Sequence, residues 1–141
     1  MFSITSRLKF NRIFKPVNET HCRYRVVLGS AGSGKSVNVA QDFILKLSDI
    51  KYTGANLLVI RKSEGTNRYS TFAELQAVIF RMCGEYWEDF WIINSSRLMI
   101  TSKITGNSII FRGVNDKKQR EKLKSITFPK GKLVWVWIEE A

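Results

Sequence analysis

The sequence predicts an α/β fold with a mainly parallel β-sheet, and three observations support this prediction. Apolar runs at residues 55–60 and 132–138 are typical of buried parallel strands, and a shorter run at residues 23–28 ends in β-branched and apolar residues. Between these runs, apolar residues recur at three- and four-residue spacing, as on one face of a helix. The chain has 141 residues, of which 44% are hydrophobic, so it can fill one modest core.

A glycine-rich motif follows the first predicted strand. Residues 29–36, GSAGSGKS, match the pattern GxxxxGK[ST] at every defined position. After the motif, Ala40, Phe43, Ile44 and Leu47 mark one face of a predicted helix. Strand, glycine loop and helix in this order are typical of a phosphate-binding loop, so the predicted fold class is a P-loop NTPase. The alternative, a flexible Gly/Ser linker, does not account for the flanking strand and helix.

The motif predicts a site for ATP and Mg²⁺. Glycines allow a tight turn that directs backbone N–H groups at one phosphate chain, and the helix N-terminus adds the positive end of its dipole. Lys35 is expected to reach the β- and γ-phosphates, and the Ser36 hydroxyl is expected to ligate Mg²⁺. The expected nucleotide-binding residues are Gly29, Ser30, Ala31, Gly32, Ser33, Gly34, Lys35 and Ser36.

Further elements are expected downstream of the motif. Residues 71–74 (TFAE) have the spacing of a capping box, and a helical stripe follows that Gly84 can end. The stripe consists of Phe72, Leu75, Val78, Ile79 and Met82. Residues 97–101 and 108–112 flank Gly106-Asn107, which predicts a β-hairpin.

Two adjacent carboxylates, Glu139 and Glu140, follow the last predicted strand. In open α/β sheets, ligands lie at the carboxyl ends of the strands, so these acids are expected to meet the phosphates of the glycine loop. Glu139 is expected to hold Mg²⁺ through water, and Glu140 to orient and deprotonate the water that attacks the γ-phosphate. The alternative is two solvated acids after a strand, which the upstream glycine loop disfavours.

The charge of the chain points to a polyanionic partner. Lys and Arg number 23 against 12 Asp and Glu, which gives a formal net charge of +11. Residues 1–25 carry six bases and one acid, and residues 115–132 carry seven bases and two acids, so each stretch has a net charge of +5. Nucleic acid is the simplest such partner, although many small basic proteins bind none. Because no apolar run approaches the ~20 residues of a membrane helix, no membrane partner is expected.

The sequence resembles the large terminase subunit of tailed bacteriophages, the ATPase of the DNA-packaging motor. The stretches that carry the resemblance are FNRIFKPV ahead of RYRVVLGSAGSGKS, then LLVIRKSEGTNRYSTFAELQAVI, SIIFRGVNDKKQREKLKSI and VWVWIEEA. Many P-loop ATPases share the glycine motif and the acidic strand end. The RK…S…F…L and FRG…LKSI stretches, in this order and at these spacings, are what point to terminases.

The resemblance implies an ASCE-type ATPase that drives double-stranded DNA into a phage capsid in the cytoplasm of the bacterial host. It places residues 29–36 on the Walker A motif and Glu140 on the catalytic glutamate of Walker B. Glu139 stands where many relatives have Asp, and its extra methylene favours a water-mediated magnesium contact. Further implied partners are a small terminase subunit, a portal protein and other copies of the chain in a ring.

The resemblance also implies a cation that acts on the neighbouring subunit, often an Arg before the Walker B strand. Lys124 lies in the matching region, and Arg120 and Arg112 are alternatives, so this residue is left unassigned.

By the same resemblance, residues 1–141 are expected to be the N-terminal part of an ATPase domain. A basic segment (residues 1–22) precedes a nucleotide-binding core (residues 23–141) that stops after the Walker B strand. The family's nuclease domain would lie beyond it, as would a strand that such ATPases place between the Walker A and Walker B strands. These 141 residues alone are therefore expected to turn over little or no ATP. The alternatives are a helicase-type ATPase, a small-molecule kinase, or a nucleotide-binding prophage remnant without turnover.

Overall fold

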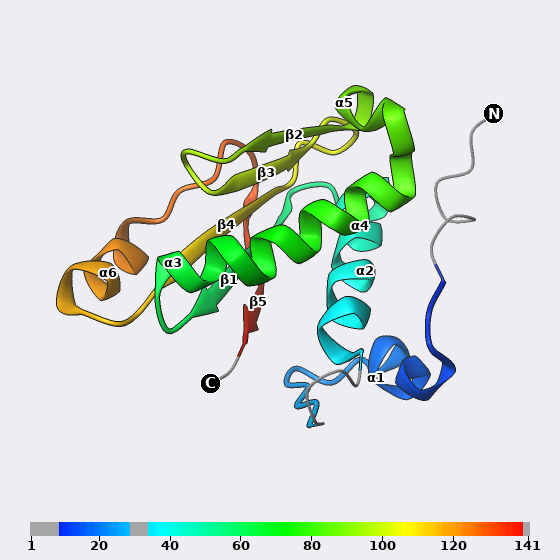
Figure 1. The fold of residues 1–141 in the computed structure, drawn as a ribbon, viewed down its shortest axis with the longest axis horizontal. Helices are drawn as coiled ribbons and strands as arrows, with labels where there is room; N and C mark the ends of the chain where they lie inside the picture. The colour runs from blue at the N-terminus through cyan, green and yellow to red at the C-terminus, as the bar shows by residue number, and fades with distance from the viewer. Residues whose placement is uncertain (1–8, 29–33, 140–141) are drawn as a thin grey trace.

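A computed structural model describes residues 9–28 and 34–139 of the chain. Within them, five strands form one sheet in the order β2-β3-β4-β1-β5 (Figure 1). Their bounds are β1 (Ala55–Arg61), β2 (Trp91–Asn94), β3 (Met99–Ser102), β4 (Ser108–Gly113) and β5 (Lys132–Ile138). Strands β4, β1 and β5 are parallel, whereas β2, β3 and β4 pair antiparallel. The α/β class is confirmed, as is the hairpin predicted around Gly106-Asn107, which is β3–β4. The parallel part of the sheet comprises strands β4, β1 and β5.

The helices connect the strands, and the two longest of them cover one face of the sheet. Their bounds are α1 (Lys15–Glu19), α2 (Lys35–Ser48), α3 (Glu64–Asn67), α4 (Ala73–Cys83), α5 (Trp87–Phe90) and α6 (Lys117–Lys122). A π-helical segment, Arg68–Phe72, joins α3 to α4, and short 3₁₀ turns lie at Arg12–Phe14, Ile50–Tyr52, Gly84–Tyr86 and Leu123–Ser125. Figure 1 shows α2 and the α3–α4 rod in front of the sheet. None of the helices within the described ranges is long and apolar enough to span a membrane.

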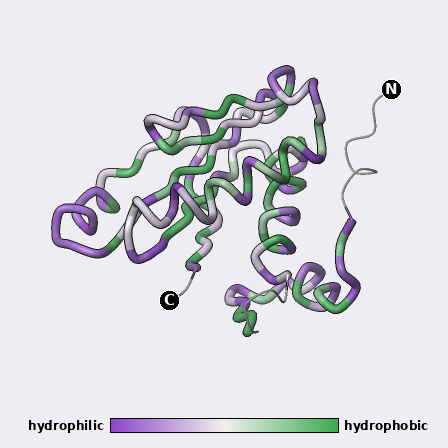
Figure 2. The backbone as a smooth tube through the Cα atoms, viewed as in Figure 1, coloured by the Kyte–Doolittle hydropathy of each residue, from purple (hydrophilic) through white to green (hydrophobic). Residues whose placement is uncertain are grey.

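The core lies between the sheet and helices α2 and α4. The predicted helix faces supply it: Ala40, Ile44 and Leu47 of α2 are fully buried, and so is the stripe that runs along α4. The sheet contributes alternate residues, among them Val59 and Phe111. Figure 2 shows the same division, with hydrophobic strands and a hydrophilic α6. Burying each large apolar side chain contributes roughly 1.5–3 kcal/mol, so these faces hold α2 and α4 on the sheet.

The predicted capping box at residues 71–74 is wrong. The helical backbone already begins at Glu64, so Thr71 lies inside the rod, where its hydroxyl donates to the Asn67 carbonyl and side-chain oxygens. This local bonding back to the preceding turn replaces the N-cap that the spacing suggested. The predicted stop at Gly84 is confirmed, because this residue follows α4 with a positive φ of 58°.

Buried amides fix the amino-terminal edge of the parallel strands. The Asn107 side chain accepts from the Gly54 N–H at 2.8 Å and donates to the Tyr52 carbonyl at 2.9 Å. Asn56 accepts from the Ser108 N–H at 2.7 Å and donates to the Lys130 carbonyl at 2.8 Å. These bonds tie the turn before β1 to the starts of β1, β4 and β5.

Two predictions of burial are wrong. Residues 23–28 form no strand, and the side chains of Tyr24, Val26 and Leu28 are 78%, 81% and 91% exposed. Strand β5 forms as predicted, but only Trp137 is buried, because β5 lies at the edge of the sheet and pairs with β1 alone among the described residues. Apolar composition predicts strand propensity, whereas burial also requires neighbouring elements that cover the side chains.

The exposed edge of β5 predicts self-association of the 141-residue polypeptide. Val134 is half-exposed on the sheet face opposite α2, and an apolar edge strand is a template for pairing with another chain. We expect Val134→Lys to weaken self-association several-fold in sedimentation velocity. Tyr69→Lys, at an exposed position in the π-helical segment, is the matched control and should change nothing. Equal association of the two variants would exclude the β5 edge as the contact.

Candidate nucleotide site

The described part of the glycine motif forms the start of α2. Gly34 precedes the helix with φ of 82°, a left-handed conformation that favours glycine, and its carbonyl accepts the first helical bond from the Asn38 N–H at 3.0 Å. Lys35 and Ser36 therefore lie in the first helical turn, where the backbone N–H groups and the helix dipole favour an anion. Residues 29–33 lie outside the described residues, as does Glu140.

The Ser36 side chain contacts the acidic end of β5. Its Oγ donates a hydrogen bond to Glu139 Oε1 at 2.7 Å, across 103 residues of sequence. The second carboxylate oxygen, Oε2, accepts from the Trp137 indole Nε1 at 3.1 Å. The structure thus brings together the two residues predicted to hold Mg²⁺, at the carboxyl end of a parallel strand. Their roles as ligands stay predictions.

The pairing of β5 with β1 places Glu139 at this position. The Glu139 N–H donates to the Ile60 carbonyl at 3.0 Å, which extends the β-ladder one residue past β5. Aromatic packing then sets α2 against the strand: the Phe43 ring lies 6.0 Å from the Trp135 ring and 6.3 Å from the Trp137 ring. Because Ser36 and Phe43 belong to the same helix, these contacts bring the helix start to the strand end.

The segment before the motif supports the start of α2. Phe14 is buried, with its ring 3.9 Å from a Cβ built on Gly34. The side-chain amides of Asn18 and Asn38 donate to each other, both at 2.9 Å. Figure 1 shows this segment, with α1, beside the lower end of α2. Sequence patterns do not predict this support, because the segment lacks clear periodicity and its only signal is the resemblance of FNRIFKPV.

The three candidate cations lie in or after β4. Arg112 pairs with Ile60 on the sheet face opposite Val59 and Trp137, and its guanidinium donates to the Phe111 carbonyl at 2.9 Å. The Arg120 guanidinium donates to the Val114 carbonyl at 3.2 Å, and Lys124 is exposed in a 3₁₀ turn. These contacts are to the local backbone, so the residue that acts on a neighbouring subunit stays unassigned.

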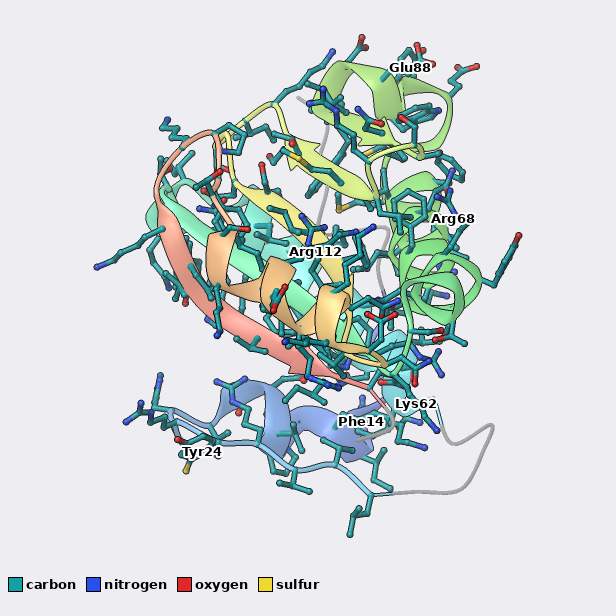
Figure 3. All side chains as sticks on the ribbon, turned by 90° about the vertical axis from the view of Figure 1, so that its left-hand side faces the viewer. Phe14, Tyr24, Lys62, Arg68, Glu88 and Arg112 are labelled. Atoms are coloured by element: carbon teal, nitrogen blue, oxygen red, sulfur yellow. The ribbon has the colours of Figure 1, made fainter. Side chains whose placement is uncertain are left out.

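Helix α6 forms an exposed basic surface at the same end of the sheet. The Asp116 side chain caps it by accepting from the Gln119 N–H at 2.8 Å, which explains why so polar a segment is helical. Figure 3, which looks onto the left-hand end of Figure 1, shows Arg112 beside α6. A polyanion would meet positive charge there.

A family model described as "Phage terminase large subunit" matches residues 21–141. The chain belongs to this family. The large terminase subunit of Bacillus phage SPP1 is 36% identical over 121 residues, which is 85% of this chain and 26% of the SPP1 protein. The chain therefore spans about a quarter of the length of that terminase. The predicted family resemblance is confirmed.

The paired amides of this terminase chain predict a stability effect. Asn18→Ala would leave the buried Asn38 side chain without its partner, at a cost of about 1–3 kcal/mol. We expect the unfolding free energy in urea to fall by that amount. The double variant Asn18→Ala/Asn38→Ala should be less destabilised than the sum of the two single variants. Additive losses would show that the amides act independently.

Proposed function

We propose that this chain is part of the ATPase of a phage DNA-packaging motor, which hydrolyses ATP to move double-stranded DNA into a capsid. The observation that carries the proposal is the hydrogen bond between Ser36 and Glu139, which joins the start of α2 to the acidic end of β5. Membership of the terminase large subunit family supports it. Partners proposed on the same ground are a small terminase subunit, a portal protein and further copies of the chain in a ring.

The residues present fit ATP with Mg²⁺. A hydroxyl and a carboxylate are hard oxygen ligands of the kind that Mg²⁺ takes, and the neighbouring helix start suits phosphate. Ser36 and Glu139 would hold the ion, Glu139 through water, while Lys35 and the loop at residues 29–34 would hold the phosphates. Bound Mg²⁺ supplies positive charge against the charge that develops on the transferred phosphoryl group.

The protein's own groups would then carry out the hydrolysis. Lys35, half-buried in the first turn of α2, places a cation beside the phosphates and stabilises their negative charge in the transition state. Glu140, directly after Glu139, takes the proton from the attacking water. The hydroxyl of Ser36 and the carboxylate of Glu139 would hold Mg²⁺ beside the phosphate chain.

The two adjacent acids are expected to give different phenotypes in the full-length protein. Glu140→Gln should keep nucleotide affinity and lower the hydrolysis rate by about 10²–10⁴-fold, because an amide preserves shape but takes no proton. Glu139→Gln should instead raise the Mg²⁺ concentration needed for half-maximal activity. Lys35→Ala is the reference variant that lacks the phosphate site. The three variants and the wild type are compared in steady-state ATPase assays. Reversed phenotypes of the two glutamine variants would exclude these roles, and wild-type binding without turnover would favour a non-hydrolysing protein.

The basic surface on α6 predicts how DNA binding depends on salt. Replacing Lys117, Lys118 and Lys122 with Gln should reduce the slope of log K against log [salt] by about 0.9 per lost phosphate contact. Sequence preference should stay unchanged, because phosphate contacts carry no base information. The matched control neutralises Lys51, Arg81 and Lys103, which are exposed and lie outside both basic stretches. Fluorescence anisotropy with duplex DNA measures both. Equal slopes for the two triple variants would exclude α6 as a DNA contact.

A further inference from the structure

The Trp137 indole holds one oxygen of the Glu139 carboxylate while Ser36 holds the other. Trp137 is 7% exposed, and its Nε1–H donates to Glu139 Oε2 at 3.1 Å. Ser36 donates to Oε1 at 2.7 Å. An indole N–H donates and has no acceptor capacity, so the direction of its hydrogen bond is not ambiguous. The two oxygens of Glu139 are therefore distinguished by their donors.

The strand geometry makes this contact rigid. Residues two apart in a strand project to the same face, so Trp137 and Glu139 lie side by side on the face that α2 covers. The Trp137 ring stacks on Phe43 at an interplanar angle of 29°, with 6.3 Å between ring centroids. Val59 pairs with Trp137 on β1, which fixes the backbone beneath the ring. Packing against Phe43 and the pairing of the Trp137 backbone with β1 therefore fix the position of the indole.

We propose that Trp137 is a positioning residue for the magnesium site, an inference that rests on the proposed function. By holding Oε2, it turns Oε1 toward Ser36 and the ion. A glutamate has one more rotatable bond than an aspartate, so ordering its side chain costs more conformational entropy. The indole bond restricts that freedom before the ion binds. Because the indole holds Oε2, Oε1 is the oxygen that would face the ion, through water.

The experiment removes the N–H and keeps the ring. Trp137→Phe retains an aromatic ring against Phe43 but has no donor for Glu139. Trp135→Phe is the matched control, because Trp135 lies on the same strand and face, with its ring 6.0 Å from Phe43. Binding of a fluorescent ATP analogue to the full-length protein is measured with Mg²⁺ and with chelator. Thermal unfolding of both variants confirms that they fold.

We expect Trp137→Phe to reduce the gain in nucleotide affinity that Mg²⁺ gives by about 10-fold or more, as for other groups that orient a metal ligand. Affinity in chelator should stay unchanged, and Trp135→Phe should match the wild type. A purely structural role for Trp137 would leave the response to Mg²⁺ unaltered. An unaltered response in Trp137→Phe, together with its loss in Glu139→Gln, overturns the positioning role while the proposed function survives. If both Trp137→Phe and Glu139→Gln keep the response to Mg²⁺, this result counts against the magnesium site itself.

A spectroscopic measurement tests the proposal even if Trp137→Phe does not fold. In ¹⁵N-labelled wild-type protein, the indole N–H resonance of Trp137 should shift when Mg²⁺ and nucleotide bind, because the carboxylate that accepts its bond changes its electrostatic environment. Glu139→Gln should shift the same resonance without ligand. The Trp135 indole resonance should shift less in both experiments. A Trp137 resonance that responds to neither change overturns the proposal.

Discussion

Helix α2 and strand β5 meet through three aromatic rings, and the candidate site depends on that contact. A helix cannot join a β-ladder, so side chains must set its position along the strand. Phe43 packs on Trp135 and Trp137, and Trp135 also contacts Tyr52 edge-on at 5.4 Å. Aromatic pairs contribute about 0.5–1.5 kcal/mol each beyond their buried area. This packing sets the distance between Ser36 and Glu139, because Ser36 lies on the same helix as Phe43 and Glu139 directly follows the strand that carries Trp135 and Trp137.

The register of β5 against β1 is the second constraint, and it is set at the other end of the sheet. Gly131 approaches Gly54 so closely that a Cβ on Gly131 would lie 2.2 Å from the Gly54 carbonyl oxygen. The Lys132 N–H donates to that carbonyl at 3.0 Å, which starts the ladder. A slip of one residue would move Trp137 to the opposite face and Glu139 with it. Buried amides and two glycines at the start of the strands therefore determine where the acid lies at their end.

Local patterns were sufficient to predict the elements that carry the site. The spacing of Ala40, Ile44 and Leu47 predicted α2, and the apolar run at residues 132–138 predicted β5. The rule that ligands gather at the carboxyl ends of parallel strands then predicted that Ser36 and Glu139 lie together, since it needs only the order of the elements. The predicted roles of both residues, and of the loop at residues 29–34, remain to be tested.

What local patterns could not supply is the environment of each element. Residues 23–28 and β5 have the composition of buried strands, yet burial depends on neighbours that a single run of sequence does not specify. Thr71 matched a capping box because the spacing rule does not show that the helix already began at Glu64. The bond from Trp137 to Glu139 was within reach of the alternation rule, since W-x-E on a strand places both side chains on one face. Only the burial of Trp137 against α2 shows that its N–H needs a hydrogen-bond partner there, and the partner that it has is the carboxylate expected to hold the metal.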